Sequence, residues 1–204
     1  MENKTRWTLW CRTKACLINR KRVRDFYADM EAHTEETSDV AFDLFGRYGR
    51  LKALYKTAGR KCGLGVWGPE FDRGHLLVFD SVELDHVHRR KGYATRLVDA
   101  VLDKARCVTG DSFFAICQPG AVAAELYRRD YKWNSAEYRV ANDELLTAAL
   151  RFWRSVGFRR IGSSSYFALT ADKNHASYAV RSDKDFDMEG VVNRALFHLD
   201  KELA

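Results

Sequence analysis

The sequence is poor in proline and lacks the close cysteine pairs that build metal or redox sites. Only 2 of its 204 residues are proline, and the five cysteines, at positions 11, 16, 62, 107 and 117, include no Cys-x-x-Cys pair. An odd number of scattered cysteines argues against a disulfide framework or a structural zinc site. We therefore expect free thiols and a reducing compartment, the cytoplasm or the nucleus.

Long hydrophobic runs and low-complexity tracts are also missing. No stretch reaches the roughly 18 uninterrupted apolar residues that a membrane-spanning helix needs. Apolar residues make up 46% of the chain, a globular value, and no repeat or linker divides it. These features predict a single domain over residues 1–204 and no membrane partner.

Positive charge is concentrated at the N-terminus of a chain with a net charge of +6. The first 24 positions contain one acid, Glu2, and the basic residues Lys4, Arg6, Arg12, Lys14, Arg20, Lys21, Arg22 and Arg24. Such a segment is compatible with contact to nucleic acid or acidic lipid, or with a targeting presequence. The apolar residues within it, Trp7, Leu9, Trp10, Leu17 and Ile18, favour a packed strand.

A strand–turn–helix order over residues 76–105 is the most informative feature. Leu76–Leu84 is a largely apolar run, a basic turn with Gly92 follows, and apolar residues then recur at helical spacing from Ala94 to Ala105. Backbone N–H groups at such a helix start lack intrahelical partners and bind a pyrophosphate well. The alternative is that Gly92 only relieves a tight turn and that Arg89, Arg90 and Lys91 are solvated.

Two blocks together resemble one enzyme family. Arg89-Arg90-Lys91-Gly92-Tyr93-Ala94 resembles the acyl-CoA pyrophosphate loop of the GNAT superfamily of N-acetyltransferases. Residues 149–158 are similar to that family's late helix, Ala-x-x-x-Tyr-x-x-x-Gly-Phe, and residues 112–117 fit the strand that splays from its neighbour to admit the pantetheine arm. The resemblance covers about residues 48–171.

The resemblance implies an α/β fold, a twisted mixed sheet flanked by helices in one domain, with a core at about 48–171. An N-terminal strand and helices would occupy residues 1–47, and an amphipathic helix about 187–203. Further expected elements are a strand at 5–16, a helix at 20–36, a short helix capped at 37–39 and ending at Phe45, paired strands at 51–56 and 64–67, a helix from an Asn142 cap to Gly157, and a hairpin of 158–161 with 165–169. Residues 121–141 read as an insertion whose portion 121–129 is helical.

The implied activity is transfer of an acetyl group from acetyl-CoA to a primary amine by direct attack in a ternary complex, with no metal. The expected cofactor contacts are Leu84, Arg89, Arg90, Lys91, Gly92, Tyr93, Ala94 and Thr95. A bulge near Leu84 would aim backbone N–H groups at the thioester carbonyl. A small apolar role for Cys117 is preferred over a nucleophilic one.

The acceptor amine needs a base, and the central strand offers Glu83, Asp80 and Asp85. Glu83 interrupts an apolar run, although it could instead orient a cationic substrate or pair with an arginine. The acids favour a cationic acceptor, and the aromatic residues between 127 and 138 could stack on it. His86 and His88 read as a solvated pair, because no third metal ligand with suitable spacing is evident.

The general acid is where the chain departs from the family, because Trp153 stands where the late helix usually has tyrosine. Tyr166, or a tyrosine of the insertion (Tyr127, Tyr131 or Tyr138), could replace it, or water could protonate the departing thiolate. A catalytically silent acyl-CoA-binding regulatory module is therefore one alternative function, and a nucleic-acid-binding protein using the basic N-terminus is a weaker one. Both a monomer and a homodimer remain open.

Overall fold

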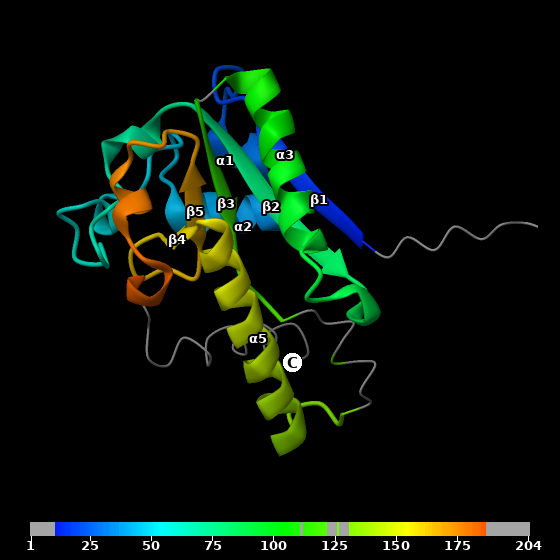
Figure 1. Ribbon diagram of the computed structural model, residues 1–204. Coiled ribbons are helices and arrows are strands. Elements are labelled where there is room, and N and C mark those ends of the chain that lie inside the picture. The colour runs from blue at the N-terminus through cyan, green and yellow to red at the C-terminus, as the bar shows by residue number, and fades with distance from the viewer. Residues whose placement is uncertain (1–10, 111, 122–125, 127–130, 187–204) are drawn as a thin grey trace, which may run out of the picture.

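The computed structural model describes residues 11–110, 112–121, 126 and 131–186, and they build a mixed sheet between helices (Figure 1). The strands are β1 (Cys11–Ile18), β2 (His75–Leu84), β3 (Phe113–Cys117), β4 (Arg159–Arg160) and β5 (Phe167–Thr170). Their order is β1-β2-β3-β5-β4, with the β2–β3 pair parallel and the other pairs antiparallel. The predicted fold class is confirmed.

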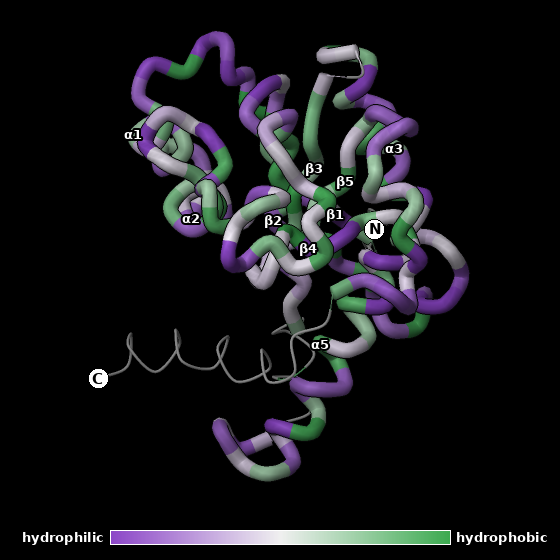
Figure 2. Tube along the Cα trace, turned by 90° about the vertical axis from the view of Figure 1, so that its left-hand side faces the viewer, coloured by the Kyte–Doolittle hydropathy of each residue, from purple (hydrophilic) through white to green (hydrophobic). Residues whose placement is uncertain are grey.

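Helices cover both faces of the sheet. The α-helices are α1 (Phe26–Glu31), α2 (Glu35–Leu44), α3 (Tyr93–Thr109) and α5 (Ala136–Val156), and the 3-10 turns are η1 (Ala53–Tyr55), η2 (Pro69–Asp72), η3 (His86–His88), η4 (Ala176–Ala179) and η5 (Ser182–Lys184). Figures 1 and 2 show α1 and α2 on one side of the sheet and α3 on the other, together with the C-terminal half of α5.

Strand β2 shows why the apolar run at its start is continuous. Leu76 and Val78 enter the core shared with α1 and α2, whereas Leu77 and Phe79 enter the core shared with α3 and α5. A strand buried on both faces needs apolar residues at successive positions, not at alternate ones. The predicted strand and the helix that follows it are both confirmed.

The two helices expected at 20–36 and from 37–39 to Phe45 are present with other bounds: the first is only Phe26–Glu31, and the second begins at Glu35 after a break at Thr34. Thr34 accepts a hydrogen bond from the backbone N–H of Thr37, and the Thr37 hydroxyl accepts one from Thr34 in return. This reciprocal capping starts α2 before the caps expected at 37–39. The buried Thr37 hydroxyl also donates to the Met30 carbonyl oxygen at 2.6 Å, which joins the two helices.

The paired strands expected at 51–56 and 64–67 are absent from the described structure, where turns and η1 take their place. Gly59 lies so close to the chain that a Cβ there would be 2.3 Å from the carbonyl oxygens of Ala53 and Leu54. A hydrogen bond from Lys61 N to Leu54 O, 2.8 Å, closes the same coil. The segment therefore forms a tight coil around Gly59 and not the two expected strands.

Helix α5 begins earlier than expected. Its N-cap is Ser135, whose hydroxyl accepts from the N–H of Tyr138 at 3.2 Å, so the Asn142 cap is wrong and the end of the presumed insertion, 136–141, belongs to the helix. Gly157 ends the helix as predicted, with φ +110°. The hairpin of β4 and β5 is confirmed. The predicted helix from 187 lies outside the described residues, as do residues 5–10 of the first strand and most of 121–129.

Two glycines with similar backbone angles should differ in their tolerance of alanine. A Cβ on Gly49 (φ +65°) would lie 2.6 Å from Phe26 Cδ2, whereas one on Gly92 (φ +76°) meets nothing within 4 Å. Both alanine variants carry the left-handed strain of about 1–2 kcal/mol. Gly49→Ala adds overpacking of about 1–3 kcal/mol, so its Tm should fall further by several degrees. Equal Tm losses in thermal denaturation would contradict this packing.

Candidate functional site

Strand β2 continues past the end of its pairing with β3, and we refer to its unpaired edge as the slot. Their parallel pairing runs from His75 opposite Phe113 to Phe79 opposite Cys117, where β3 ends. Strand β2 continues to Leu84, and over this stretch its partner is β1 on one side. Within the described residues no strand pairs with the other edge of Asp80–Leu84. Main-chain groups along that edge are therefore placed to bind an extended ligand.

A β-bulge at Asp80 marks the start of this slot. Lys14 lies opposite Ser81 and Ala15 lies opposite Phe79, so Asp80 is the extra residue on β2. A bulge of this kind bends the strand and re-aims its side chains. The bulge expected near Leu84 is thus found at Asp80 instead.

The turn after β2 carries two left-handed residues, Arg90 (φ +61°) and Gly92 (φ +76°). Such conformations are costly for a side-chain-bearing residue and occur often at ligand clamps. Gly92 is the N-cap of α3, and no side chain caps this helix start. The N-terminus of α3 therefore presents backbone N–H groups and the positive end of the helix dipole.

The residues expected to contact the cofactor meet at this turn. Arg90, Lys91, Gly92 and Thr95 are exposed, and the open space beside Gly92 leaves room for a ligand. Arg89 is half-buried, and its Nε donates to the Leu84 carbonyl oxygen at 3.4 Å. Val98, Leu102 and Ala105 hold α3 against the sheet, which fixes its first turn, Tyr93–Thr95, beside the end of β2.

The two candidate bases on β2 have different surroundings. Asp80 Oδ1 accepts a hydrogen bond from the Thr34 hydroxyl at 3.4 Å, so it faces the start of α2. Partial burial, with the charge of Glu36 next in size, raises the pKa of Asp80. Glu83 instead forms an ion pair with Arg12 across the β1–β2 ladder, with Oε2 at 2.9 Å from Nε and 2.7 Å from Nη2. The alternative role considered for Glu83, pairing with an arginine, is the one seen in the structure.

Asp85 and the histidine pair belong to η3. Asp85 Oδ1 accepts from the Val87 N–H at 3.3 Å and lies 2.8 Å from His86 Nδ1. His86 is exposed, and His88 packs edge-on to Tyr93. In the parts of the chain that the structure describes, no group of three His, Cys, Asp or Glu residues is placed to hold a metal ion.

The buried Tyr166 is hydrogen-bonded to the exposed Asp43 of α2. The Tyr166 hydroxyl donates to Asp43 Oδ2 at 2.9 Å, and the tyrosine is 2% exposed. Burial and the charges of Asp43 and Asp39 raise the Tyr166 pKa, so its proton is held firmly. The pKa of Tyr55 is also raised, mainly by burial and to a lesser extent by the charge of Asp43.

Three carboxylates on α2 are candidate site residues that the sequence analysis did not single out. Glu36, Asp39 and Asp43 follow helical spacing and so share one side of α2. All three are exposed, whereas Thr37, Val40, Ala41 and Leu44 form the buried side of α2. The charge of Glu36 contributes to the raised pKa of Asp80, and the charges of Asp39 and Asp43 contribute to that of Tyr166. The spacing of these acids is the signal that would have found them.

Trp153 and Cys117 belong to the core between the sheet, α3 and α5. Trp153 is 7% exposed and packs edge-on against Phe79, Phe158 and Phe152, with ring centroids 4.8–5.4 Å apart. Cys117 is 1% exposed, and burial raises its thiol pKa well above the usual value, which opposes a thiolate. Both side chains serve packing.

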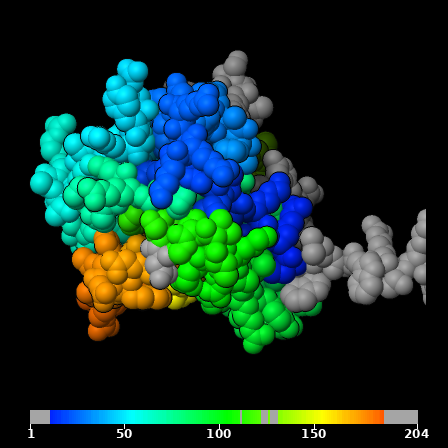
Figure 3. Space-filling view, turned by 90° about the horizontal axis from the view of Figure 1, so that it is seen from above, coloured from blue at the N-terminus to red at the C-terminus, as the bar shows by residue number. Residues whose placement is uncertain are grey.

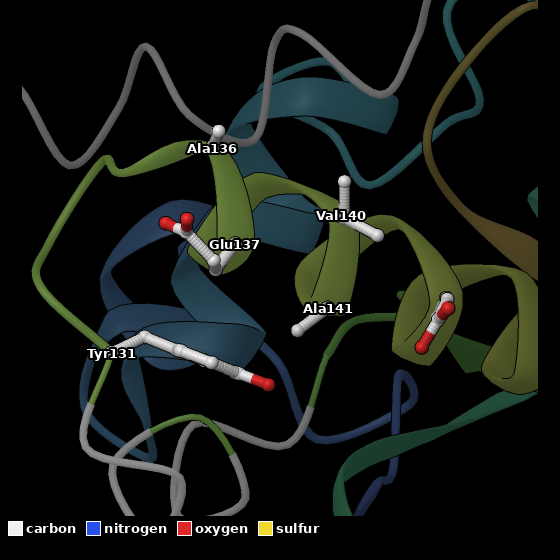
Figure 4. Close-up of a pocket in the computed structure, with 6 residues that line it drawn as sticks. Tyr131, Ala136, Glu137, Val140 and Ala141 are labelled. Atoms are coloured by element: carbon white, nitrogen blue, oxygen red, sulfur yellow. The ribbon is translucent and has the colours of Figure 1, made fainter.

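A hollow lies beside the first half of α5, in the region of the presumed insertion. A cavity of about 380 Å³ is lined by Tyr131 and by Ala136, Glu137, Val140, Ala141 and Glu144 of the helix. Figure 4 shows the Tyr131 ring lying along these first turns, with the Glu137 carboxylate above it. Tyr138 is 8% exposed and packs on Trp133 at 4.8 Å, and Tyr127 lies outside the described residues.

Comparison with known proteins agrees with this geometry. The family model described as the acetyltransferase (GNAT) family matches residues 19–131, just over half of the chain, and this range contains β2, the turn at Gly92, α3 and β3. No curated protein and no solved structure gives a significant match. Among the described helices none is long and apolar enough to cross a membrane. The open edge of β2, the bulge and the uncapped basic helix start thus lie within the matched range, and the chain belongs to the GNAT acetyltransferase family.

Proposed function

We propose that the protein transfers an acetyl group from acetyl-CoA to a primary amine by direct attack in a ternary complex. The observation that carries this proposal is the junction of two binding features at one end of β2. The unpaired edge of Asp80–Leu84 suits an extended pantetheine arm, and the start of α3 suits a pyrophosphate. One CoA molecule has both groups.

Different groups of the turn residues would contact the cofactor. The backbone of Arg90–Ala94 and the Thr95 hydroxyl would hold the pyrophosphate, with Arg89 and Lys91 adding charge. We call the turn and the first residues of α3, Arg89–Thr95, the cradle. The hydrogen bond from Arg89 to the Leu84 carbonyl oxygen connects the cradle to the end of the slot. A Cβ at Gly92 would meet nothing within 4 Å, so the space beside this residue is open to a ligand.

Asp80 is the better placed of the two candidate bases. An acceptor amine with a pKa of about 10.4 must lose a proton before it attacks. A carboxylate whose pKa is raised accepts that proton more readily than an ordinary one, and Asp80 has this property. Glu83 is held by Arg12, so we assign it a lesser role, the ordering of the acceptor or of a water molecule.

The acceptor is a cationic amine. Glu36, Asp39 and Asp43 are exposed on α2, and their charges act on Asp80 and Tyr166, beside which the acceptor would bind. Several carboxylates that face one region attract a cation and raise its local concentration. A polyamine, an aminoglycoside-like compound or a lysine side chain has this chemistry.

Tyr166 suits positioning better than proton donation. Its hydroxyl is committed to Asp43, and its raised pKa opposes loss of the proton. We infer that Tyr166 fixes Asp43 on the acceptor side. The departing CoA thiolate, with a pKa near that of a free thiol at about 8.5, would take its proton from water.

A silent acyl-CoA-binding module is the second candidate function. The packing of Trp153 in the core, where the family usually places tyrosine, favours it. Binding of acetyl-CoA without release of free thiol in the presence of cationic amines would decide for this alternative. All five cysteines are free, which supports a reducing compartment, and we propose the cytoplasm.

The cradle is tested with two substitutions of one glycine. Gly92→Glu puts a carboxylate where the pyrophosphate would lie, and it should weaken acetyl-CoA and desulfo-CoA binding by at least about tenfold, as one lost charge-assisted contact does. Gly92→Ala carries the same left-handed strain without the charge and should retain most of the affinity. Titration calorimetry measures both. Equal affinities for wild type and Gly92→Glu would place the cofactor elsewhere.

Kinetics should rank the candidate bases. Loss of a general base typically costs about 10²–10⁴-fold in rate. Asp80→Asn should therefore lower kcat by this amount at neutral pH, and Glu83→Gln should lower it by less and raise the KM for the amine. The measurement is thiol release from acetyl-CoA with spermidine as acceptor. A larger kcat loss in Glu83→Gln than in Asp80→Asn would reverse the assignment.

The raised pKa of Asp80 also predicts a pH-dependent stability. Because folding raises this pKa, the ionised carboxylate destabilises the folded state, and the penalty develops as pH rises through the folded pKa. Asp80→Asn should thus have the higher Tm at pH 7, and the difference should vanish below about pH 4, where Asp80 is protonated in both states. Thermal denaturation across this range checks it. A lower Tm for Asp80→Asn at pH 7 would show that the carboxylate stabilises the fold.

A further inference from the structure

A basic cavity lies at the opposite end of the sheet from the slot. It has a volume of about 260 Å³ and is lined by Arg20, Arg24, Arg47, Tyr48, Gly49 and Asp72, among others. Arg20 follows the end of β1 that pairs with the beginning of β2, whereas the slot is at the far end of β2. Figure 3 looks down on this end, where the loop after β1 adjoins the segment after α2.

Arg20 is built into the floor of this region as a fixed cation. Its Nη1 donates to the carbonyl oxygens of Phe71 (2.7 Å) and Arg73 (3.3 Å), and its Nη2 donates to that of Gly49. The guanidinium also lies over the Phe45 ring, 5.1 Å from its centroid. These contacts hold the charge in place without neutralising it. The buried Nε makes no hydrogen bond within the described structure.

The acids near Arg20 are already engaged. Asp72 accepts from the Leu51 N–H at 2.8 Å through Oδ1 and pairs with Lys56 at 2.6 Å through Oδ2. Asp29 accepts from the backbone N–H of Arg24 at 2.9 Å. Asp25 caps α1 by accepting from the Ala28 N–H.

Burial lowers the pKa of Arg20 to about 10 against the opposing effect of the Asp72 charge, so Arg20 remains charged at neutral pH. Three arginines and one acid, Asp72, line the cavity, and this excess of positive charge attracts an anion.

Two further arginines are available to a ligand. Arg24 and Arg47 are exposed, and the Arg47 guanidinium lies 5.0 Å from the centroid of the Tyr48 ring. Tyr48 is 76% exposed, which is unusual for a large aromatic side chain. Guanidinium groups bind phosphate oxygens in a bidentate manner, and an aromatic ring can contact the body of the ligand.

We propose that this cavity binds a phosphate monoester dianion, held by Arg24 and Arg47 with Arg20 as a fixed third cation. The small volume, about 260 Å³, suits one phosphoryl group with a small body rather than a long polyanion. The proposal is independent of acetyl transfer, because it uses none of the residues of the slot or of the turn at Gly92.

The test is an NMR titration of the full chain with inorganic phosphate and with O-phosphoserine. We expect saturable shifts of the Arg47, Tyr48 and Gly49 amides that are separate from any shifts at Gly92 and Tyr93. The double variant Arg24→Gln/Arg47→Gln should weaken binding at the cavity at least tenfold. Arg50→Gln, which removes one charge from the same turn but does not line the cavity, should bind as the wild type does.

Two outcomes would overturn the site. One is the absence of shifts at Gly49 up to 20 mM O-phosphoserine, a concentration chosen to detect weak binding of about 10 mM. The other is equal affinity in Arg50→Gln and the double variant. A lipid source of the phosphate is distinguished by vesicles of phosphatidylcholine with and without phosphatidic acid. Binding to the acidic vesicles alone, lost in the double variant, identifies a headgroup, whereas free phosphoserine binding without vesicle binding identifies a soluble ligand.

Discussion

The early end of the β2–β3 pairing is the constraint on which the site depends. Each main-chain group in a sheet needs a partner, and the second edge of Asp80–Leu84 loses the strand that would provide one. The fold can leave this edge open because α3 and α2 cover the two faces of the same strand (Figure 2). An extended ligand that supplies amide groups completes the sheet, which explains how one strand can serve both stability and binding.

The bulge at Asp80 links this slot to the α2 side of the sheet. By inserting one residue into β2, it turns a carboxylate toward Thr34 at the start of α2. The reciprocal capping of Thr34 and Thr37 sets where α2 begins, and therefore where its acidic residues stand. The local chemistry of two threonines thus determines the electrostatics of the proposed acceptor region.

Much of the core and the turn at Gly92 could be predicted from the sequence, because their signals are local. The apolar run of β2 and the helical spacing of α3 follow from burial, and Gly92 marks the left-handed turn between them. The coil around Gly59 and the bulge at Asp80 could not be predicted, because one depends on a close backbone approach and the other on the register with β1, and no periodicity encodes either. The break at Thr34 has a local cause, the reciprocal capping with Thr37, but several neighbouring polar residues could equally have capped the helix.

Hydrogen–deuterium exchange with and without acetyl-CoA tests the central claim most directly. If acetyl-CoA lies between β2 and β3, peptides that cover 80–84 and 90–96 should exchange more slowly when it is present, since their amides gain acceptors. The peptides of α1 and of the β4–β5 hairpin should not change. Protection that omits residues 80–84, or no protection at saturating acetyl-CoA, would contradict the slot as the acyl-CoA site.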